Sequence, residues 1–329
     1  MRLHENKELF RDAVLATSQI KGIPEIYIEK DYWVTFALYH IFHSEMAKEV
    51  VFKGGTALSK CYRLIERFSE DIDVVVLRHQ GENDNQLKKK IRTVGKIVES
   101  VMPEIDIPEI TNKRGNIRKT VHQYEKTFKG NFGQVREQII FEATWLGSSE
   151  PFTIETINCY VADMMIENNQ RELIKEYGLE PFELPVLSKE RTLSEKIMSL
   201  ARFSLLENPY ESLSNKIRHI YDIHMMLKNE EIRAYFESDG FDKMMITVGN
   251  DDVISYKNNN EWLKIHPAEA AIFSQPEITW ENIKSPYKTT FSELVIGDLP
   301  KEKELIETLK LVYYRLRKVK WEVNSLKID

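Results

Sequence analysis

One stretch of the sequence constrains the fold more than any other: two apolar segments joined by a glycine pair and a short helical spacer. The first apolar segment, residues 50–52, leads into Gly54-Gly55. The second begins Asp71-Ile-Asp73 and continues with β-branched residues, so we expect a strand there. Side chains alternate along a strand, so both aspartates are predicted to project from the same face of a sheet.

This arrangement favours a phosphate and metal site. Two carboxylates that lie close together repel each other unless a cation lies between them or water solvates them. Magnesium takes one or two carboxylates and shares its remaining positions with nucleotide phosphates. Gly54 and Gly55 lack a Cβ atom, so their amides can approach a phosphate. A lone glycine pair is usually a turn and a lone Asp-x-Asp a solvated strand end, but joined in this order they predict a nucleotidyl-transfer site.

At these residues the chain resembles the AbiEii/MenT-type nucleotidyltransferase toxins, a branch of the DNA polymerase β-like superfamily. The spacer between the glycines and the aspartates, Thr56 to Glu70, is longer than is usual in the superfamily and argues against its antibiotic-modifying members. The toxin-type pattern is matched at Gly54, Gly55, Thr56, Lys60, Arg67, Ser69, Asp71 and Asp73.

Three further segments extend the resemblance. Residues 28–34 resemble the N-terminal helix signature of the family, residues 191–197 its third motif with Lys196, and residues 218–223 its fourth motif with Asp222. The resemblance implies that Asp71 and Asp73 hold Mg²⁺ or Mn²⁺ and are catalytic together with Lys196 and Asp222. It implies nucleotide contacts from Gly54, Gly55, Thr56, Lys60, Arg67 and Ser69.

A third metal-binding carboxylate is expected on a neighbouring strand. Glu142 lies in the apolar run Gln138–Thr144, where a buried charge needs a partner or a metal. The alternatives are a solvated face or an ion pair with a nearby Lys or Arg. Glu155 competes for the same role.

The remaining candidate residues keep open alternatives. Lys196 lies beside the apolar stripe of its helix, where it can reach a phosphate or extend to the surface. Asp222 stands among apolar residues and can orient Lys196, accept a proton from the acceptor hydroxyl, or pair with Arg218. Arg67 can bind a phosphate or Glu70.

The chain has 329 residues, which is enough for about two domains. Of these residues, 42% are hydrophobic and 30% are charged, which is typical of a globular protein. The absence of a long apolar run or signal core, and only two cysteines, predict a cytoplasmic protein without a membrane span. The net charge of −6 argues against indiscriminate nucleic-acid binding. Three basic clusters are nevertheless candidate RNA contacts: Lys88–Lys90 with Arg92 and Lys96; Lys113-Arg114 with Arg118-Lys119; and Arg315, Arg317, Lys318 and Lys320.

The predicted fold class is α+β. A polymerase β-like core with a small mixed sheet and N-terminal helices is expected over residues 1–188, and a mainly helical domain that closes the active-site cleft over residues 189–329. Strands are predicted near 50–52, 71–77, 117–124, 138–145 and 152–157. Helices are predicted near 5–20, 24–44, 56–64, 86–102, 162–177, 189–207, 214–229, 230–238, 260–271 and 300–322.

The expected function is Mg²⁺-dependent transfer of a nucleoside monophosphate from a nucleoside triphosphate. By resemblance, the acceptor is RNA, at the 3′ end of tRNA. The same resemblance implies a toxin of a type IV toxin–antitoxin or phage abortive-infection system, with a winged-helix antitoxin as partner. The alternatives are a protein or small-molecule acceptor, or a nucleotide-binding toxin without catalysis.

Overall fold

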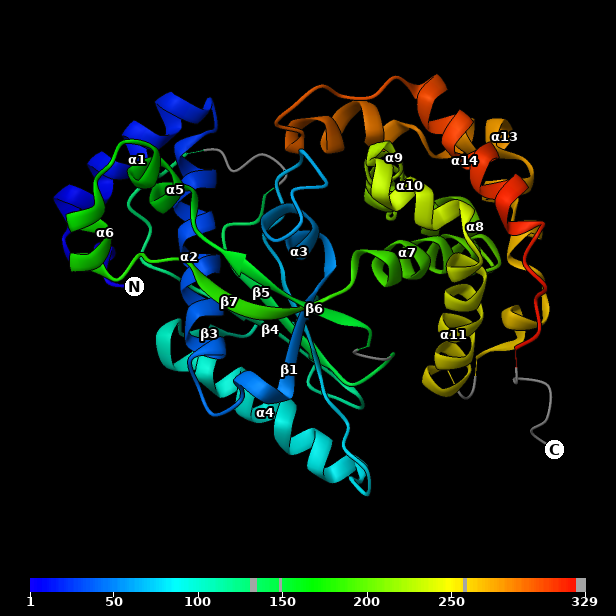
Figure 1. Ribbon diagram of the computed structural model, residues 1–329, viewed down its shortest axis with the longest axis horizontal. Coiled ribbons are helices and arrows are strands. Elements are labelled where there is room, and N and C mark those ends of the chain that lie inside the picture. Colours follow the sequence, from blue (N-terminus) through cyan, green and yellow to red (C-terminus); the bar gives the residue numbers. More distant parts are fainter. Residues whose placement is uncertain (131–134, 148–149, 257–258, 324–329) are drawn as a thin grey trace. The chain divides into compact units, whose positions relative to one another are not determined.

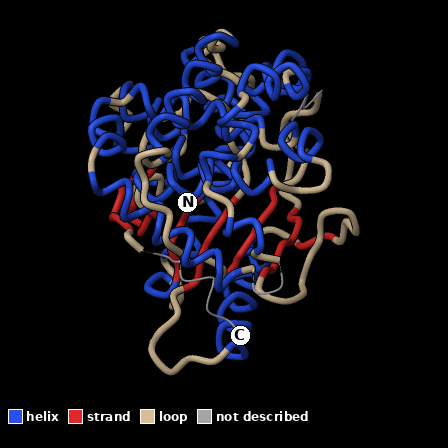
Figure 2. The backbone as a smooth tube through the Cα atoms, turned by 90° about the vertical axis from the view of Figure 1, so that its right-hand side faces the viewer, coloured by secondary structure: helices blue, strands red, loops and turns tan. Residues whose placement is uncertain are grey.

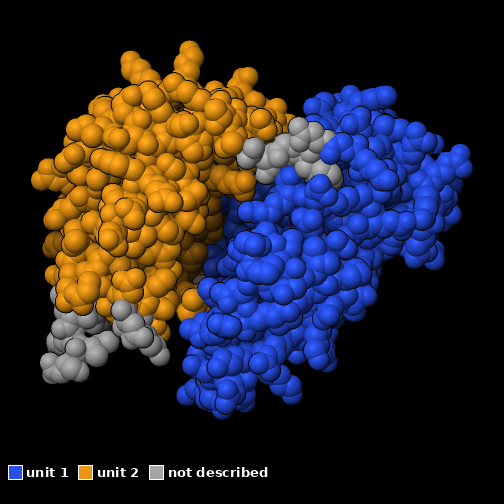
Figure 3. Space-filling model, turned by 180° about the vertical axis from the view of Figure 1, so that it is seen from behind, with its two compact units in different colours: residues 1–62, 68–145, 152–187 blue, residues 63–67, 146–151, 188–329 orange. Residues whose placement is uncertain are grey.

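The computed structural model describes residues 1–130, 135–147, 150–256 and 259–323. The chain forms two compact units, which Figure 3 colours separately. Unit 1 comprises residues 1–62, 68–145 and 152–187, and unit 2 comprises residues 63–67, 146–151 and 188–329. The main division therefore falls after Leu187, and two short segments belong to unit 2 although the chain around them belongs to unit 1.

Unit 1 is built on a mixed sheet (Figures 1 and 2). The sheet has seven strands in the order β3-β4-β5-β2-β1-β7-β6. Its strands are β1 Val50–Lys53, β2 Ile72–Val76, β3 Glu104–Ile105, β4 Ile117–His122, β5 Ile139–Thr144, β6 Phe152–Ile157 and β7 Phe182–Leu187. Strand β2 pairs antiparallel with β1 and parallel with β5, so it lies in the interior of the sheet. The predicted α+β class is confirmed, with a sheet larger than expected.

The helices of unit 1 are α1 Lys7–Lys21, α2 Glu25–Phe42, α3 Gly54–Lys60, α4 Asp84–Val101, α5 Tyr160–Glu167 and α6 Arg171–Tyr177. Helix α4 is amphipathic: Leu87, Ile91, Val94 and Val98 are buried at helical spacing, and the helix packs on β4 and β5. Helix α2 is buried almost throughout, including its charged residues Glu29, Lys30 and Asp31.

Unit 2 is mainly helical. Its α-helices are α7 Lys189–Ser204, α8 Pro209–Ser214, α9 Ile217–Lys228, α10 Glu230–Glu237, α11 Asp239–Ser255, α12 Ala271–Ser274, α13 Pro276–Ile283 and α14 Glu302–Leu316. Helix α7 packs against α8, α9 and α11. The segment 63–67 joins this unit through a β-bridge between Arg67 and Val295 and a hydrogen bond from Ile296 N to Glu66 O of 2.8 Å.

Several elements differ from the sequence-based expectations. The predicted helix 162–177 is two helices, α5 and α6, and the predicted helix 260–271 consists mainly of short 3₁₀ turns. Strand β7 and helix α11 were not predicted: Pro185 argues against a strand, and α11 has no clear apolar face. Within the described ranges, no helix combines the length and apolar character needed to cross a membrane.

Candidate active site

A row of four charged side chains crosses the centre of the sheet in unit 1. Asp73 on β2 is in register with Lys53 on β1 and with Glu142 on β5. Glu142 is in turn in register with Lys119 on β4, and the distance from Lys119 Nζ to Glu142 Oε2 is 3.4 Å. Because residues in register share a face of the sheet, the row places the two carboxylates side by side and one cation at each end.

The predicted carboxylate pair lies at the start of β2. Asp71 immediately precedes the strand, and its buried Oδ1 atom has no hydrogen-bond partner among the described residues. Burial, followed by the charges of Asp71 and Glu142, raises the pKa of Asp73 to about 7. A buried carboxylate oxygen without a partner, next to two further carboxylates, is costly unless a cation is bound. The donor set therefore fits a hard divalent cation.

The glycine pair lies directly against these carboxylates. Helix α3 begins at Gly54, immediately after β1, and Gly54 has a φ of +86°, which favours glycine. A Cβ atom at this position would collide with Oδ2 of Asp73. Gly55 follows in the first turn of α3. The backbone of Gly54 and the carboxylate of Asp73 are therefore in direct contact.

Thr56 and Ser69 connect α3 to the start of β2. The hydroxyl of Thr56 donates a hydrogen bond of 2.6 Å to the backbone carbonyl of Asp71 and lies 3.0 Å from the hydroxyl of Ser69. Thr56 is buried, whereas Ser69 is half-buried. Thr56 thus fixes the backbone that carries Asp71, and Ser69 remains partly accessible.

Lys60 has a partner inside the protein. Its ammonium forms an ion pair with Asp31 of α2, and both side chains are 5% exposed. Despite burial, which disfavours the ammonium, the Asp31 carboxylate raises the pKa of Lys60. Asp31 also accepts a hydrogen bond of 2.8 Å from the backbone N–H of Tyr160. The Lys60 side chain is therefore held by α2 and α5.

A second buried ion pair connects α2 to the residue before Asp71. Lys30 Nζ lies 2.8 Å from Glu70 Oε2, and their side chains are 0% and 5% exposed. Glu70 also accepts a hydrogen bond from the backbone N–H of Arg136. The sequence analysis assigned no role to Lys30 or Asp31. The available signal was a run of three charged residues, Glu29 to Asp31, within the otherwise apolar segment 28–34.

In unit 2, three predicted site residues form one buried cluster. Arg67 binds both oxygens of Asp222, with Nε–Oδ1 and Nη2–Oδ2 distances of 2.7 and 2.8 Å. Lys196 Nζ lies 2.8 Å from Asp222 Oδ2. Against its burial, the charges of Arg67 and Lys196 hold the pKa of Asp222 well below its ordinary value. The carboxylate therefore stays ionised, and it is a poor proton acceptor in this cluster.

The sheet topology separates the two candidates for the third carboxylate. Glu142 lies on β5, next to β2 and in register with Asp73. Glu155 lies on the edge strand β6, three strands away from β2, which corresponds to about 14 Å. Glu155 accepts a hydrogen bond of 3.0 Å from the hydroxyl of Thr153. Glu142 is therefore the neighbour of the carboxylate pair.

In the part of the chain that the structure describes, no group of three or more His, Cys, Asp or Glu side chains is arranged as a metal site. Two carboxylates are nevertheless sufficient when the metal arrives with a nucleotide, because Mg²⁺ is commonly bound by one or two carboxylates together with substrate phosphates.

Comparison with known proteins agrees with this geometry. Residues 37–297 match the sequence model of a family described as nucleotidyl transferase AbiEii toxin, type IV toxin–antitoxin system. The chain belongs to the AbiEii family. The resemblance inferred from the motifs is confirmed, and the chain is a nucleotidyltransferase toxin of a type IV toxin–antitoxin system. The matched range contains every predicted site residue, whereas Lys30 and Asp31 of α2 precede it.

A solved structure shares the fold of this AbiEii-family chain. MenT4, a nucleotidyltransferase toxin from Mycobacterium tuberculosis H37Rv, is similar with a TM-score of 0.55 and 15% sequence identity, over 92% of this chain and 89% of MenT4. No match was found among curated proteins.

Proposed function

We propose that this AbiEii-family enzyme transfers a nucleoside monophosphate from a nucleoside triphosphate to RNA, at the 3′ end of tRNA. The observation that carries the proposal is the carboxylate cluster at Gly54: Asp71 has a buried oxygen without a partner among the described residues, and Asp73 has a pKa raised to about 7. Carboxylates that lie close together repel each other unless a cation is bound, and groups with a strongly perturbed pKa cluster at catalytic sites.

The proposed metal ligands are Asp71 and Asp73, with Glu142 as the third carboxylate. Mg²⁺ or Mn²⁺ at these residues would neutralise phosphate charge and lower the pKa of the acceptor hydroxyl. In the reaction, the acceptor hydroxyl would give up its proton to water and its oxygen would form a bond to the α-phosphorus. The bond from the α-phosphorus to the oxygen that bridges to the β-phosphorus breaks, and pyrophosphate leaves. Lys119 lies 3.4 Å from Glu142 Oε2, on the side of Glu142 away from Asp73, and is proposed to hold this carboxylate in the row.

The nucleotide-binding residues fall into two groups. Gly54, Gly55 and Ser69 are proposed to contact phosphates, because the glycines present backbone without a Cβ atom and the Ser69 hydroxyl is half-buried. Thr56 and Lys60 are proposed to position the site, since their polar atoms have partners inside the protein.

The buried cluster of unit 2 is proposed to act on the phosphates through charge. Two cations and one carboxylate leave one net positive charge on Lys196, Arg67 and Asp222. We propose that Lys196 stabilises the departing pyrophosphate, as the family resemblance implies, and that Asp222 orients Lys196.

The biological setting is likewise a proposal. A type IV toxin requires an antitoxin, and we propose a winged-helix protein for this role, in a cytoplasmic system that acts against phage infection. Transfer to tRNA would block translation in the infected cell.

The proposal is tested by incubating the purified full chain with Mg²⁺, total tRNA and each α-labelled nucleoside triphosphate. Two variants accompany the wild type: Asp71→Ala, and Asp12→Ala as a matched control, because Asp12 is exposed on α1. We expect label on tRNA with the wild type and with Asp12→Ala, and none with Asp71→Ala. Release of pyrophosphate without labelled RNA would move the acceptor to a protein or small molecule. No pyrophosphate would favour nucleotide binding without catalysis.

A further inference from the structure

Two of the basic clusters noted in the sequence meet in one pocket of unit 1. The pocket has a volume of about 250 Å³, and none of the described residues that line it is acidic or aromatic. Its lining comes from α4, from the turn before β4, and from β4 itself. The lining residues are Lys88, Ile91 and Arg92; Lys113, Arg114 and Gly115; and Arg118.

The charges of this basic pocket are poorly balanced. Lys113 and Arg118 share a single carboxylate, that of Glu104, at an Arg118 Nη2–Glu104 Oε2 distance of 2.9 Å. Lys88, Arg92 and Arg114 form no ion pair with any described residue. Positive charge therefore accumulates in the pocket, although the whole chain has a net charge of −6.

The side chain of Arg118, which lines the pocket, has an unsatisfied hydrogen-bond donor. Its Nε atom is buried and has no hydrogen-bond partner among the described residues. A Cβ atom at Gly95 of α4 would lie only 2.6 Å from this atom, so the guanidinium is packed closely against the helix. A buried donor without a partner costs free energy that an anion or an ordered water would recover.

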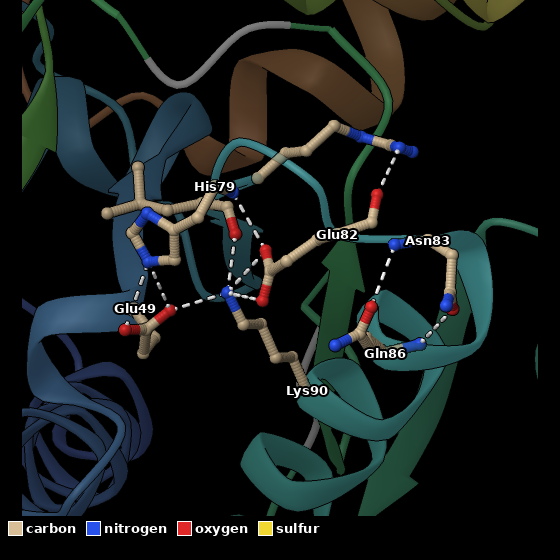
Figure 4. A network of polar contacts seen from close by, with 8 residues as sticks. Glu49, His79, Glu82, Asn83, Gln86 and Lys90 are labelled. Carbon is tan, nitrogen blue, oxygen red and sulfur yellow. Dashed lines mark hydrogen bonds and ion pairs between the residues drawn. The ribbon is translucent and has the colours of Figure 1, made fainter.

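The neighbouring lysines of α4 do not all line the pocket. Lys90 belongs to the same sequence run as Lys88, but its ammonium donates to the Leu77 carbonyl at 2.9 Å and pairs with Glu49 and Glu82 at 2.6 and 2.7 Å (Figure 4). Lys89 is exposed and does not line the pocket. Among these lysines of α4, Lys88 is thus the one directed to the pocket.

The helix spacing adds an argument for a bound anion. Lys88 and Arg92 are four residues apart and therefore lie on the same face of α4. Like charges at this spacing repel each other and destabilise a helix. An anion between the two side chains would convert this repulsion into attraction.

The pocket lies on the opposite face of the sheet from the carboxylate row. Arg118 and Lys119 are adjacent on β4, so their side chains project to opposite faces. Lys119 reaches Glu142, whereas Arg118 reaches the α4 side. The basic pocket is therefore a site separate from Asp71 and Asp73.

We propose that this basic pocket binds backbone phosphates of the RNA acceptor, away from the end that reacts. The inference rests on the proposed function, because it takes the acceptor to be RNA. The volume is smaller than that of most small-molecule sites. Among the described residues, the lining has Ile91 as its large apolar side chain and no aromatic side chain on which a base or a cofactor could stack. Side chains of this kind contact phosphates and fix the register of a nucleic acid without selecting its sequence.

The test compares two double variants that remove the same charge from the same helix. Lys88→Gln/Arg92→Gln removes two pocket cations, and Lys89→Gln/Lys96→Gln removes two exposed lysines of α4 that lie outside the pocket. Binding of labelled tRNA to the full chain is measured without nucleotide over a range of KCl concentrations. We expect the pocket variant to bind about tenfold or more weakly, with a salt dependence reduced by about two phosphate contacts, and the control to differ little from the wild type.

Equal behaviour of the two double variants would overturn the proposal. It would also be overturned if the wild type bound no tRNA but bound inorganic pyrophosphate through Lys88 and Arg92, because the ligand would then be a free phosphate. Label transfer separates this inference from the proposed function. If the pocket variant binds RNA with wild-type affinity and still labels tRNA, only the role of the pocket in RNA binding is refuted. If the wild type labels no RNA, the proposed function is refuted.

Discussion

The carboxylate of Asp73 lies directly against the backbone of Gly54, so that a Cβ atom at position 54 would collide with Oδ2 of Asp73 and lie 3.2 Å from its Cγ. Because Gly54 directly follows β1 and opens α3, the first glycine of the motif determines where the Asp73 carboxylate can lie. The glycine is therefore required by a close approach as well as by its positive φ of 86°.

This contact predicts that Gly54→Ala abolishes nucleotide transfer, because the new methyl group displaces the Asp73 carboxylate. The expected loss of stability is about 1–3 kcal/mol, from the left-handed backbone and the collision together. Gly22→Ala is the matched control, since Gly22 has a φ of +65° but nothing within 4 Å of the added Cβ. Transfer assays and urea unfolding of both variants check the prediction. Equal activity in the two variants would contradict it.

Asp73→Asn is expected to stabilise the metal-free protein while it reduces transfer by about a hundredfold or more. Burial, followed by the charges of Asp71 and Glu142, raises the pKa of this carboxyl group to about 7. Asparagine removes this repulsion, and we expect a gain on the order of 1 kcal/mol, or about 2–4 °C in Tm, at pH 8.

The sign of the pH dependence follows from the raised pKa. Folded Asp73 retains its proton between the ordinary value of 3.8 and about 7, whereas the unfolded chain has already released it. As the pH rises through this window, the free energy of unfolding of the wild type therefore falls relative to that of Asp73→Asn. Above the window, the difference between the two proteins stays constant. Thermal unfolding with EDTA at pH 4 and pH 8 measures this difference. Mg²⁺ should then stabilise the wild type more than Asp73→Asn. A variant less stable than the wild type at pH 8 would argue against this interpretation.

The register of β2 and β5 predicts different effects for the two candidate third carboxylates. Glu142→Gln should reduce transfer by about a hundredfold, because Glu142 is in register with Asp73. Glu155→Gln should remain within about twofold of the wild type, since Glu155 lies on the edge strand β6. The measurement is the rate of pyrophosphate release at saturating nucleotide. The reverse order of effects would assign the role to Glu155.

The centre of the fold could be predicted because local signals agree there. The β-branched residues of β1 and β2, the glycine pair and the two aspartates all point to the same strand–helix–strand unit, and the structure has β1 at Val50–Lys53 and β2 at Ile72–Val76. Helix α11 was missed because its apolar residues do not follow one face, and it is formed against α7. Its existence depends on tertiary packing that no local pattern records.

The partners of the charged residues could not be predicted from the sequence. Lys60 and Arg67 match the family pattern, but the pattern does not say that Asp31 and Asp222 hold them. Such pairs join positions that are far apart in the chain, and only the folded topology brings them together. The same holds for the basic pocket, which two separate sequence clusters form jointly.

In the cluster around Asp222, we expect substitutions of Asp222 and of Lys196 to lower the free energy of unfolding by different amounts. Asp222→Asn leaves Arg67 and Lys196 buried together without a carboxylate, and we expect a loss of about 3–5 kcal/mol. Lys196→Gln leaves both hydrogen bonds from Arg67 to Asp222 intact, so we expect the free energy of unfolding to fall by only about 1–2 kcal/mol. Nucleotide transfer should fall strongly.

Urea unfolding at several pH values checks this order. Because the pKa of Asp222 is depressed, its contribution is fully present above the ordinary value of 3.8 and is lost as the pH falls further. The difference between the wild type and Asp222→Asn should therefore be constant above about pH 5 and shrink below pH 4. A difference that grows on acidification would contradict the assignment.

The last prediction concerns the buried ion pair of Lys60 and Asp31. If Lys60 positions α3 and does not bind phosphate, Lys60→Met should destabilise the protein by about 3–5 kcal/mol, because it leaves the Asp31 carboxylate buried without its cation. Asp31→Asn/Lys60→Met should recover part of this loss, because no buried charge remains at the pair. The affinity for nucleotide in the folded double variant should stay within about threefold of the wild type.

Lys7→Met is the control for the loss of a lysine ion pair, since Lys7 and its partner Glu125 are 74% and 69% exposed. Its unfolding midpoint should equal that of the wild type. Nucleotide binding is measured by calorimetry on variants shown to be folded by circular dichroism. A folded double variant that loses nucleotide affinity by a hundredfold would return Lys60 to the phosphate-binding residues, since destabilisation alone cannot lower the affinity of the folded population.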